Sequence, residues 1–250
     1  MSRELDGKVA IVTGAARNIG RAICVALAEA GANVVVNTKS SVDLAQETVR
    51  QVQAVGGKAL LAPADVTDPA AVERMVEAAK KAFGGVDMLV NNAAVRKEAP
   101  FDQITFAEWQ QVLSIMLDGA FLCTKAVVPS MRARGGGAIV NIGGLTGHSG
   151  AKHRVHVVTG KAALAGFTKA IAHDLAGDKI TSNCVVPGMI ETERGQHNPL
   201  APKHHAERPR LIEPLGQPSE IAALVRHLCG PQSRYITGQS IHINGGVFMP

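Results

Sequence analysis

The chain of 250 residues lacks the marks of several protein classes. Its cysteines (Cys24, Cys123, Cys184 and Cys229) form no CxxC pair and lie in apolar stretches, which predicts buried, reduced thiols rather than a disulfide or zinc framework. No apolar run reaches the roughly 18 residues of a membrane span, and no apolar signal core precedes the first expected strand, so we expect a cytoplasmic protein without a membrane partner. No Lys/Arg block occurs and the net charge is only +5, so no nucleic-acid partner is expected.

What the sequence does contain is enough apolar material for a full core, because hydrophobic residues make up 46% and charged residues 19% of the chain. Short β-rich runs alternate with helical patterns, as in repeated βαβ units. Most of the β-rich runs are continuously apolar, which predicts parallel strands buried on both faces. Strands are expected at 9–14, 33–37, 58–63, 86–92, 137–143, 180–187 and 239–245.

Helical patterns occupy the stretches between these strands. Asp68 before Pro69 predicts a capped helix start, and Thr105 with Glu108 matches a capping box. The pattern predicts one α/β domain over the whole chain, 1–250, a doubly wound Rossmann fold with a seven-stranded, mostly parallel sheet and helices on both faces. Helices are expected at 19–30, 41–55, 69–83, 105–133, 155–176 and 218–229.

One segment, 191–216, breaks the alternation, because it is rich in proline, histidine and charge. We expect it to be a substrate lid at the carboxyl edge of the sheet, where ligands of such folds bind. Its basic residues favour an anionic substrate, such as a carboxylate or an acyl thioester, whereas a solvated loop is the alternative. The spacing of His197, His204 and His205 matches no standard zinc pattern, so no metal site is expected.

A glycine-rich turn, TGAARNIG over Thr13–Gly20, joins the first expected strand to the first expected helix. Gly14 permits a tight turn, and Gly20 permits the helix to pack closely on the sheet. The free N–H groups at the start of that helix suit a pyrophosphate, so the turn predicts a dinucleotide cofactor. The turn residues expected to contact the cofactor are Gly14, Arg17, Asn18, Ile19 and Gly20.

These and further landmarks resemble the short-chain dehydrogenase/reductase family almost from end to end. The turn is similar to the family's TGxxxGxG, with Asn18 in place of the middle glycine, a mild departure because asparagine tolerates left-handed backbone. NNAA at 91–94 is similar to the family's NNAG, and the tail YITGQSIHINGG is similar to its C-terminal strand. The resemblance implies the sheet order 3-2-1-4-5-6-7. It also implies cofactor contacts from Asp65, Val66, Asn91, Ala93, Lys161, Pro187, Gly188, Ile190 and Thr192, of which Asp65 would hold the adenine and Ile190 and Thr192 would meet the nicotinamide carboxamide.

The second expected strand ends in NTKSS without the carboxylate that NAD sites use to bind ribose hydroxyls. Arg17 and Lys39 can neutralise a 2′-phosphate, as in members of the family that prefer NADP. We therefore expect NADP(H) rather than NAD(H). The alternative is that Lys39 is an ordinary solvated lysine.

The resemblance also implies a proton-transfer set that this sequence mostly lacks. The family uses a tyrosine followed four residues later by a lysine, a serine after the fifth strand and an asparagine in the preceding long helix. Lys161 holds the lysine position, whereas Val157, Gly144 and Met116 stand at the positions of the tyrosine, serine and asparagine. The only tyrosine of the chain is Tyr235, so no shift of the alignment supplies the missing one.

Nearby histidines are candidates for a replacement acid. His153, Val157 and Lys161 are spaced by four, and they share one helix face if the helix already includes residue 153. His153 is the first candidate, followed by Lys161 acting through a water, and His156 points about 100° away around the helix. The alternative is that these histidines are exposed polar residues of a strand-to-helix loop.

Three functions remain open from the sequence. The first is an NADP(H)-dependent short-chain oxidoreductase that acts on a carbonyl or alcohol with a non-standard proton donor. The second is a nucleotide-binding pseudo-enzyme, and the third is a non-redox lyase or hydrolase on the same fold. In each enzyme the partner is a small molecule, and the resemblance implies a homo-oligomer, tetramer or dimer, built through 105–133, 155–176 and the C-terminal strand.

Overall fold

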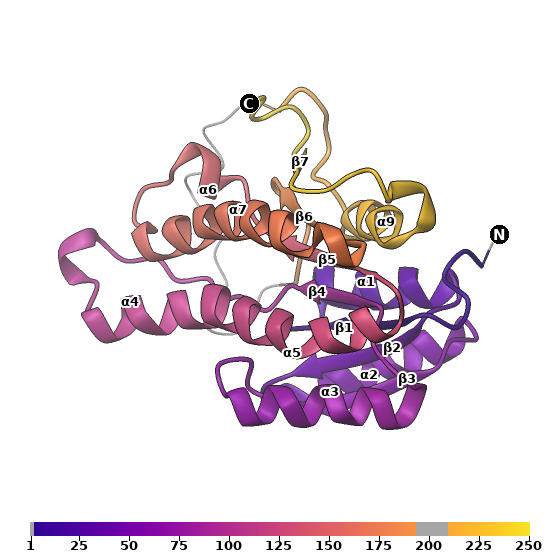
Figure 1. Cartoon of the computed structure of the whole chain (residues 1–250). Coiled ribbons are helices and arrows are strands. Elements are labelled where there is room, and N and C mark those ends of the chain that lie inside the picture. Colours follow the sequence, from indigo (N-terminus) through magenta and orange to yellow (C-terminus); the bar gives the residue numbers. More distant parts are fainter. Residues whose placement is uncertain (1–2, 194–209) are drawn as a thin grey trace.

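The computed structural model describes residues 3–193 and 210–250 and has a single seven-stranded sheet at its centre (Figure 1). The strand order is β3-β2-β1-β4-β5-β6-β7, as expected from the sequence. Each neighbouring pair of strands is parallel, so the sheet is parallel throughout rather than mostly so. The carboxyl ends of all the strands therefore lie along one edge.

All seven expected strands are present, some of them shorter than predicted. The first ends at Val12 because Gly14 turns the chain with a φ of +62°, a conformation that belongs to the glycine turn. The strands are β1 (Val9–Val12), β2 (Asn33–Thr38), β3 (Ala59–Pro63), β4 (Met88–Asn91), β5 (Gly137–Ile142), β6 (Ile180–Pro187) and β7 (Ser240–Ile243).

The α-helices are α1 (Asn18–Glu29), α2 (Val42–Ala54), α3 (Pro69–Phe83), α4 (Phe106–Leu113), α5 (Gly119–Ala133), α6 (Thr146–Ser149), α7 (Val155–Leu175) and α9 (Pro218–Cys229). Short 3₁₀ turns lie at Phe101–Gln103, Ala176–Asp178 and Pro231–Ser233. The side chain of Asp68 accepts a hydrogen bond from the N–H of Ala70, so the predicted cap of α3 is confirmed.

The expectation of one regular helix over 105–133 is wrong in its middle. A π turn, η2 (Ser114–Asp118), separates α4 from α5, and the N–H of Gly119 donates to the carbonyl of Ser114 five residues earlier. The extra residue in this turn leaves no trace in a hydrophobic pattern of period 3.6, so the sequence could not reveal it. The turn contains Met116, the residue at the family's asparagine position.

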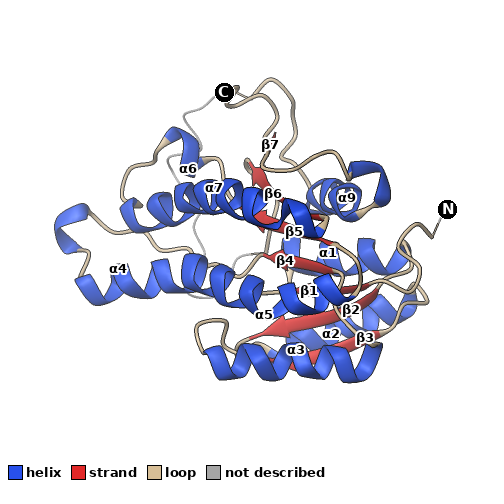
Figure 2. Ribbon diagram, viewed as in Figure 1, coloured by secondary structure: helices blue, strands red, loops and turns tan. Residues whose placement is uncertain are grey.

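The sheet is covered on both faces (Figure 2). Side chains of Ala10 and Val12 face the cluster that α1, α2 and α9 complete, whereas Ile11 between them faces the cluster of α3, α5 and α7. This alternation follows from the period of two along a strand. The stretch Phe106–Ala133 has 28 residues and is long and apolar enough to span a membrane by length and composition, but Cys123, Val127 and Met131 bury its inner side in the core.

The cysteines largely follow the prediction. Cys24, Cys123 and Cys184 are buried and free, whereas Cys229 is only half-buried. Burial raises the pKa of the Cys123 thiol to about 12, which keeps it protonated and unreactive near neutral pH.

A buried chain of hydrogen bonds joins β4, β5 and α7. Asn91 Nδ2 donates to Asn141 Oδ1 at 2.9 Å, Asn141 Nδ2 donates to Thr168 Oγ1 at 2.9 Å, and the Thr168 hydroxyl donates to the carbonyl of Leu164 at 2.7 Å. Asn141 and Thr168 are completely buried. Because water cannot replace a lost partner there, this chain of bonds fixes α7 against the centre of the sheet.

We expect Thr168→Val to lower the free energy of unfolding by about 1–3 kcal/mol, because valine keeps the volume but leaves the Asn141 amide without its acceptor. Thr168→Ser keeps the hydroxyl and is the matched control, with a smaller loss. Urea denaturation of the purified variants measures both. Equal midpoints for Thr168→Val and the wild type would contradict this role of the hydroxyl.

Candidate cofactor and catalytic site

The residues expected to form the site follow the carboxyl ends of six neighbouring strands. The glycine turn follows β1, Lys39 follows β2, and Asp65 follows β3. Asn91 ends β4, Gly144 follows β5, and Pro187 ends β6. In a parallel sheet these ends share one edge, which is where ligands of this fold class bind. The structure thus brings the predicted site residues to one side of the molecule.

The glycine turn has no room for larger residues. A Cβ on Gly20 would lie 2.6 Å from the carbonyl oxygen of Gly14 and 2.7 Å from Asn92 Nδ2. A Cβ on Gly14 would lie 2.8 Å from the Cα of Ala93. The turn therefore needs glycine at both positions, and it leaves the backbone at the start of α1 open to a phosphate group.

The turn is fixed to the loop after β4 by hydrogen bonds on both sides. Thr13 Oγ1 accepts from the N–H groups of Asn92 at 3.0 Å and Ala93 at 3.1 Å. In return, Asn92 Nδ2 donates to the carbonyls of Thr13 and Gly14, both at 2.9 Å. The sequence does not predict these bonds of Asn92, although its place in the NNAA motif is a signal for them.

Lys39 and Asp65 contact each other. The ammonium of Lys39 lies 2.6 Å from Asp65 Oδ2, and this hydrogen bond holds the pKa of the Asp65 carboxyl below its usual value. Arg17 is exposed in the glycine turn, and Val66 is buried beside Gly119. The two expected ligands of the 2′-phosphate therefore differ in their surroundings, since Lys39 already has a carboxylate partner and Arg17 is exposed.

The segment after β6 crosses toward the glycine turn. Gly188 donates to the carbonyl of Ile243 at 2.9 Å, and a Cβ on Gly188 would lie 2.6 Å from Asn244. Ile190 pairs with Gly216 in a short parallel bridge, and Thr192 Oγ1 accepts from Arg96 Nη1 at 3.5 Å. Ile190 and Thr192 thus lie in a segment held by several parts of the chain.

Lys161 on α7 lies beside the carboxyl end of β5, close to Ile142 and Gly144. Its Nζ donates to the carbonyl of Ile142 at 2.6 Å, and a Cβ on Gly144 would contact its methylene groups at 3.7 Å. Burial, reinforced by the positive charges of Arg96 and Arg154, lowers the pKa of Lys161 to about 8. Lys161 is therefore a group that can give or take a proton near neutral pH.

The positions of the family's tyrosine and asparagine are filled by an apolar cluster. Val157, Met116 and Val112 are each at most 3% exposed and pack together, with Val95 against them. Neither Val157 nor Met116 can transfer a proton. The structure places these two residues next to each other and shows that they pack as core.

The histidines differ from the expected arrangement. Helix α7 begins at Val155, as predicted, and His153 is an exposed loop residue with a φ of +60°, so the condition under which it would share a helix face with Val157 and Lys161 is not met. The left-handed backbone of His153 is incompatible with a helix, and Arg154 is the N-cap of α7. His156 is completely buried, its Nε2 lies 3.7 Å from Glu108 Oε1, and neither ring nitrogen has a hydrogen-bond partner in the described part of the chain.

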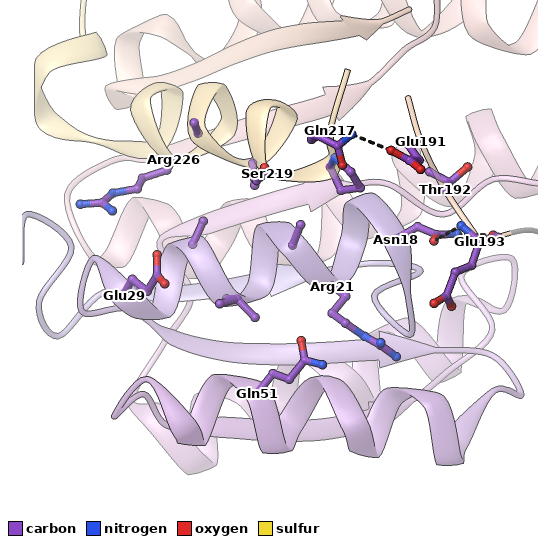
Figure 3. A pocket seen from close by; sticks show the side chains of 16 residues that line it. Asn18, Arg21, Glu29, Gln51, Glu191, Thr192, Glu193, Gln217, Ser219 and Arg226 are labelled. Carbon is purple, nitrogen blue, oxygen red and sulfur yellow. Dashed lines mark hydrogen bonds between the residues drawn. The ribbon is translucent and has the colours of Figure 1, made fainter. Parts of the chain in front are cut away.

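A groove of about 720 Å³ lies between α1 and α9 (Figure 3). Asn18, Thr192 and Glu193 form one end of it, and Glu29 and Arg226 lie toward the other. Lys161, Gly144 and Val157 do not line it. The groove therefore reaches the glycine turn at Asn18 and is separate from the residues at the catalytic positions.

Most of the expected lid, 191–216, falls outside the described residues, since positions 194–209 are not among them. The same holds for His197, His204 and His205. Within residues 3–193 and 210–250, no group of three or more His, Cys, Asp or Glu side chains is arranged to hold a metal ion.

Comparisons with known proteins agree with this geometry. Residues 14–248 match the family model described as enoyl-(acyl carrier protein) reductase. A 3-oxoacyl-[acyl-carrier-protein] reductase of Synechocystis is 36% identical over 98% of both chains, and one of Vibrio cholerae is 38% identical over 98% of this chain and 99% of its own.

Solved structures show the same relationship. A short-chain dehydrogenase of Burkholderia cenocepacia in complex with NADP is 33% identical, with a TM-score of 0.89 over 98% of this chain and 99% of that one. A double mutant of a Serratia marcescens short-chain dehydrogenase/reductase is 35% identical, with a TM-score of 0.89 over 97% of this chain and 98% of that one. With the sheet order, the glycine turn and the position of Lys161, these matches show that the chain belongs to the short-chain dehydrogenase/reductase family.

Proposed function

We propose that this protein is an NADP(H)-dependent oxidoreductase that interconverts a carbonyl and an alcohol, with Lys161 as the proton partner in place of the family's tyrosine. The observation that carries the proposal is that the glycine turn and Lys161 are present, whereas the other three residues of the family's proton-transfer set are replaced. The bound cofactor would supply or accept the hydride.

The glycine turn, Thr13–Gly20, fits the pyrophosphate of a dinucleotide. No Cβ fits at Gly14 or Gly20, so the backbone at the start of α1 can approach a pyrophosphate closely. Asn37, near the end of β2, is buried. Its Oδ1 accepts a hydrogen bond from the N–H of Gly14, and its Nδ2 donates to the carbonyls of Ala62 and Ala64. This strand end has no carboxylate of its own, and Arg17 is exposed, so Arg17 favours a 2′-phosphate, whereas Lys39 would have to share its charge between Asp65 and the phosphate. The Burkholderia relative is in complex with NADP.

Lys161 is the proton partner in this proposal. Its pKa of about 8 leaves most of the ammonium protonated at pH 7, so it can donate a proton to the substrate oxygen as that oxygen gains negative charge. In alcohol oxidation the neutral amine takes the proton back. His153 and His156 are less suited, because His153 lies outside α7 and His156 is completely buried.

The substrate we propose is a small anionic carbonyl compound or its alcohol. Arg96 and Arg154 place positive charge close enough to Lys161 to lower its pKa, and Arg210 contacts Met189 in the segment after β6. An anionic group would offset this charge. The Synechocystis and Vibrio relatives are named as 3-oxoacyl-[acyl-carrier-protein] reductases, so a 3-oxoacyl thioester is one candidate substrate.

A second candidate function is a cofactor-binding protein without turnover. The apolar cluster of Val95, Val112, Met116 and Val157 is the observation that favours it, because the cluster excludes polar groups from two catalytic positions. Tight NADPH binding without turnover on a broad panel of carbonyl compounds would support this second function over the first.

We further propose a cytoplasmic homo-oligomer, tetramer or dimer. Phe106 at the start of α4 is 72% exposed, Phe121 on α5 is 49% exposed, and Met249 in the tail is 74% exposed. Large apolar side chains on neighbouring long helices are suited to a contact between copies of the chain. Light scattering or sedimentation of the purified protein measures the assembly.

Arg17→Ala tests the preference for the phosphorylated cofactor. We expect it to weaken NADPH binding about tenfold and NADH binding much less, because a charge-assisted hydrogen bond to the 2′-phosphate is lost. Fluorescence titration measures both affinities. Arg74→Ala removes an exposed arginine on α3 and is the control. Equal losses for the two cofactors would argue against a 2′-phosphate contact by Arg17.

Lys161→Ala and Lys161→Arg test the proton partner. Alanine should lower the turnover number about 100-fold or more, the usual contribution of a positioned acid. In the wild type, carbonyl reduction should slow as the pH rises through about 8, because the ammonium loses its proton there. Arginine stays protonated and cannot release a proton to the substrate, so Lys161→Arg should also lose turnover, and its residual reduction should not decline through about pH 8. Persistence of the same decline in Lys161→Arg, with its loss in His153→Ala, would assign the proton to His153.

Val157→Tyr alone should not restore ordinary family activity, because Gly144 still leaves the substrate oxygen without the family's serine and Met116 crowds the new ring. Gly144→Ser should be tolerated, because the added Cβ would contact the Lys161 side chain only at van der Waals distance. The triple variant Met116→Asn, Gly144→Ser, Val157→Tyr should exceed both the wild type and the single variant in turnover of a 3-oxoacyl thioester. Substantial gain from Val157→Tyr alone would show that the remaining site needs no serine.

A further inference from the structure

Asn18 stands where the family's glycine turn has its middle glycine, and its side chain is fully engaged. Its φ is +52°, a left-handed conformation that glycine adopts freely and asparagine more readily than most residues. Glycine would satisfy the backbone equally well. The asparagine side chain must therefore be explained by what it contacts.

The contact is a pair of hydrogen bonds to one residue far along the chain. Asn18 Nδ2 donates to the carbonyl of Glu193 at 2.9 Å, and Asn18 Oδ1 accepts from the N–H of Glu193 at 3.0 Å. Figure 3 shows the two residues facing each other at one end of the groove between α1 and α9. The carboxamide thus pairs with Glu193 as a neighbouring strand would, and we call this pair the Asn18 clamp.

The segment that the clamp holds, 189–193, is anchored to other parts of the fold as well. The N–H of Glu191 donates to the carbonyl of Gly216 at 2.8 Å, and Gln217 Nε2 donates to Glu191 Oε2 at 2.7 Å (Figure 3). These bonds tie the segment to the start of α9. The Asn18 clamp is the tie to the glycine turn, on the side where the cofactor would bind.

We propose that Asn18 is a positioning residue that locks the segment after β6 onto the phosphate-binding turn and thereby slows release of the cofactor. The inference rests on the proposed NADP(H) site. Because the Asn18 carboxamide is committed to Glu193, the contribution of Asn18 to the phosphate comes from its backbone. The clamp holds Ile190 and Thr192, the expected nicotinamide contacts, in place before the cofactor arrives.

The variant Asn18→Gly isolates the clamp, because glycine keeps the left-handed backbone and removes only the carboxamide. Amide hydrogen exchange in the cofactor-free protein reads the clamp directly, and we expect the Glu193 N–H to exchange about three to ten times faster. Stopped-flow displacement of NADPH reads the consequence, and we expect dissociation to accelerate about threefold to tenfold.

Glu191→Ala is the matched control, because it removes the tie of the same segment to Gln217 and leaves the Asn18 clamp intact. In this variant the Glu193 N–H should exchange at the wild-type rate. Unchanged Glu193 exchange in Asn18→Gly would overturn the clamp. Faster exchange with unchanged or slower NADPH dissociation would overturn the positioning role. Faster exchange in a protein that binds no NADPH would leave the clamp established and would overturn both the positioning role and the proposed cofactor.

Discussion

The close approach of the glycine turn to the loop after β4 is the constraint on which the rest of the site depends. Side-chain space is absent at Gly14 and Gly20, and Asn92 closes the gap with hydrogen bonds to the backbone of Thr13 and Gly14. This contact fixes the amino end of α1 relative to the centre of the sheet. The phosphate-binding turn, the end of β4 and the buried bonds from Asn91 to α7 therefore form one rigid unit that also positions Lys161.

The two halves of the site have diverged to different extents. On the cofactor side the glycine turn is in close contact with the loop after β4, and Asn18 adds a clamp that a glycine could not make. On the catalytic side Val157 and Met116 form part of the core, while Lys161 is half-buried and has a lowered pKa. A lysine in such surroundings can transfer a proton without the tyrosine that it normally assists. The fold alone does not decide whether it does so, because function depends on the groups at the site.

The sequence predicted the strands, their order and most helices, because continuous apolar runs and capping residues such as Asp68 are local signals. It also predicted which residues meet at the carboxyl edge, since a parallel sheet brings strand ends together. It predicted the start of α7 at Val155, but it could not predict the π turn around Met116, which has no periodic signature, or the left-handed backbone of His153 before that helix. The pairings Lys39–Asp65 and Asn18–Glu193 were equally hidden, because they join residues far apart in the chain.

The central claim is that the protein moves a hydride between NADP(H) and a carbonyl substrate without the family's tyrosine. The most direct measurement uses NADPH deuterated at the nicotinamide C4, incubated with the wild-type protein and a panel of anionic carbonyl compounds, including 3-oxoacyl thioesters, with mass spectrometry of the products. The account predicts an alcohol that carries one deuterium on the former carbonyl carbon, formed together with oxidised cofactor. Bound NADPH that stays reduced across the whole panel, or a product formed without deuterium, would contradict it.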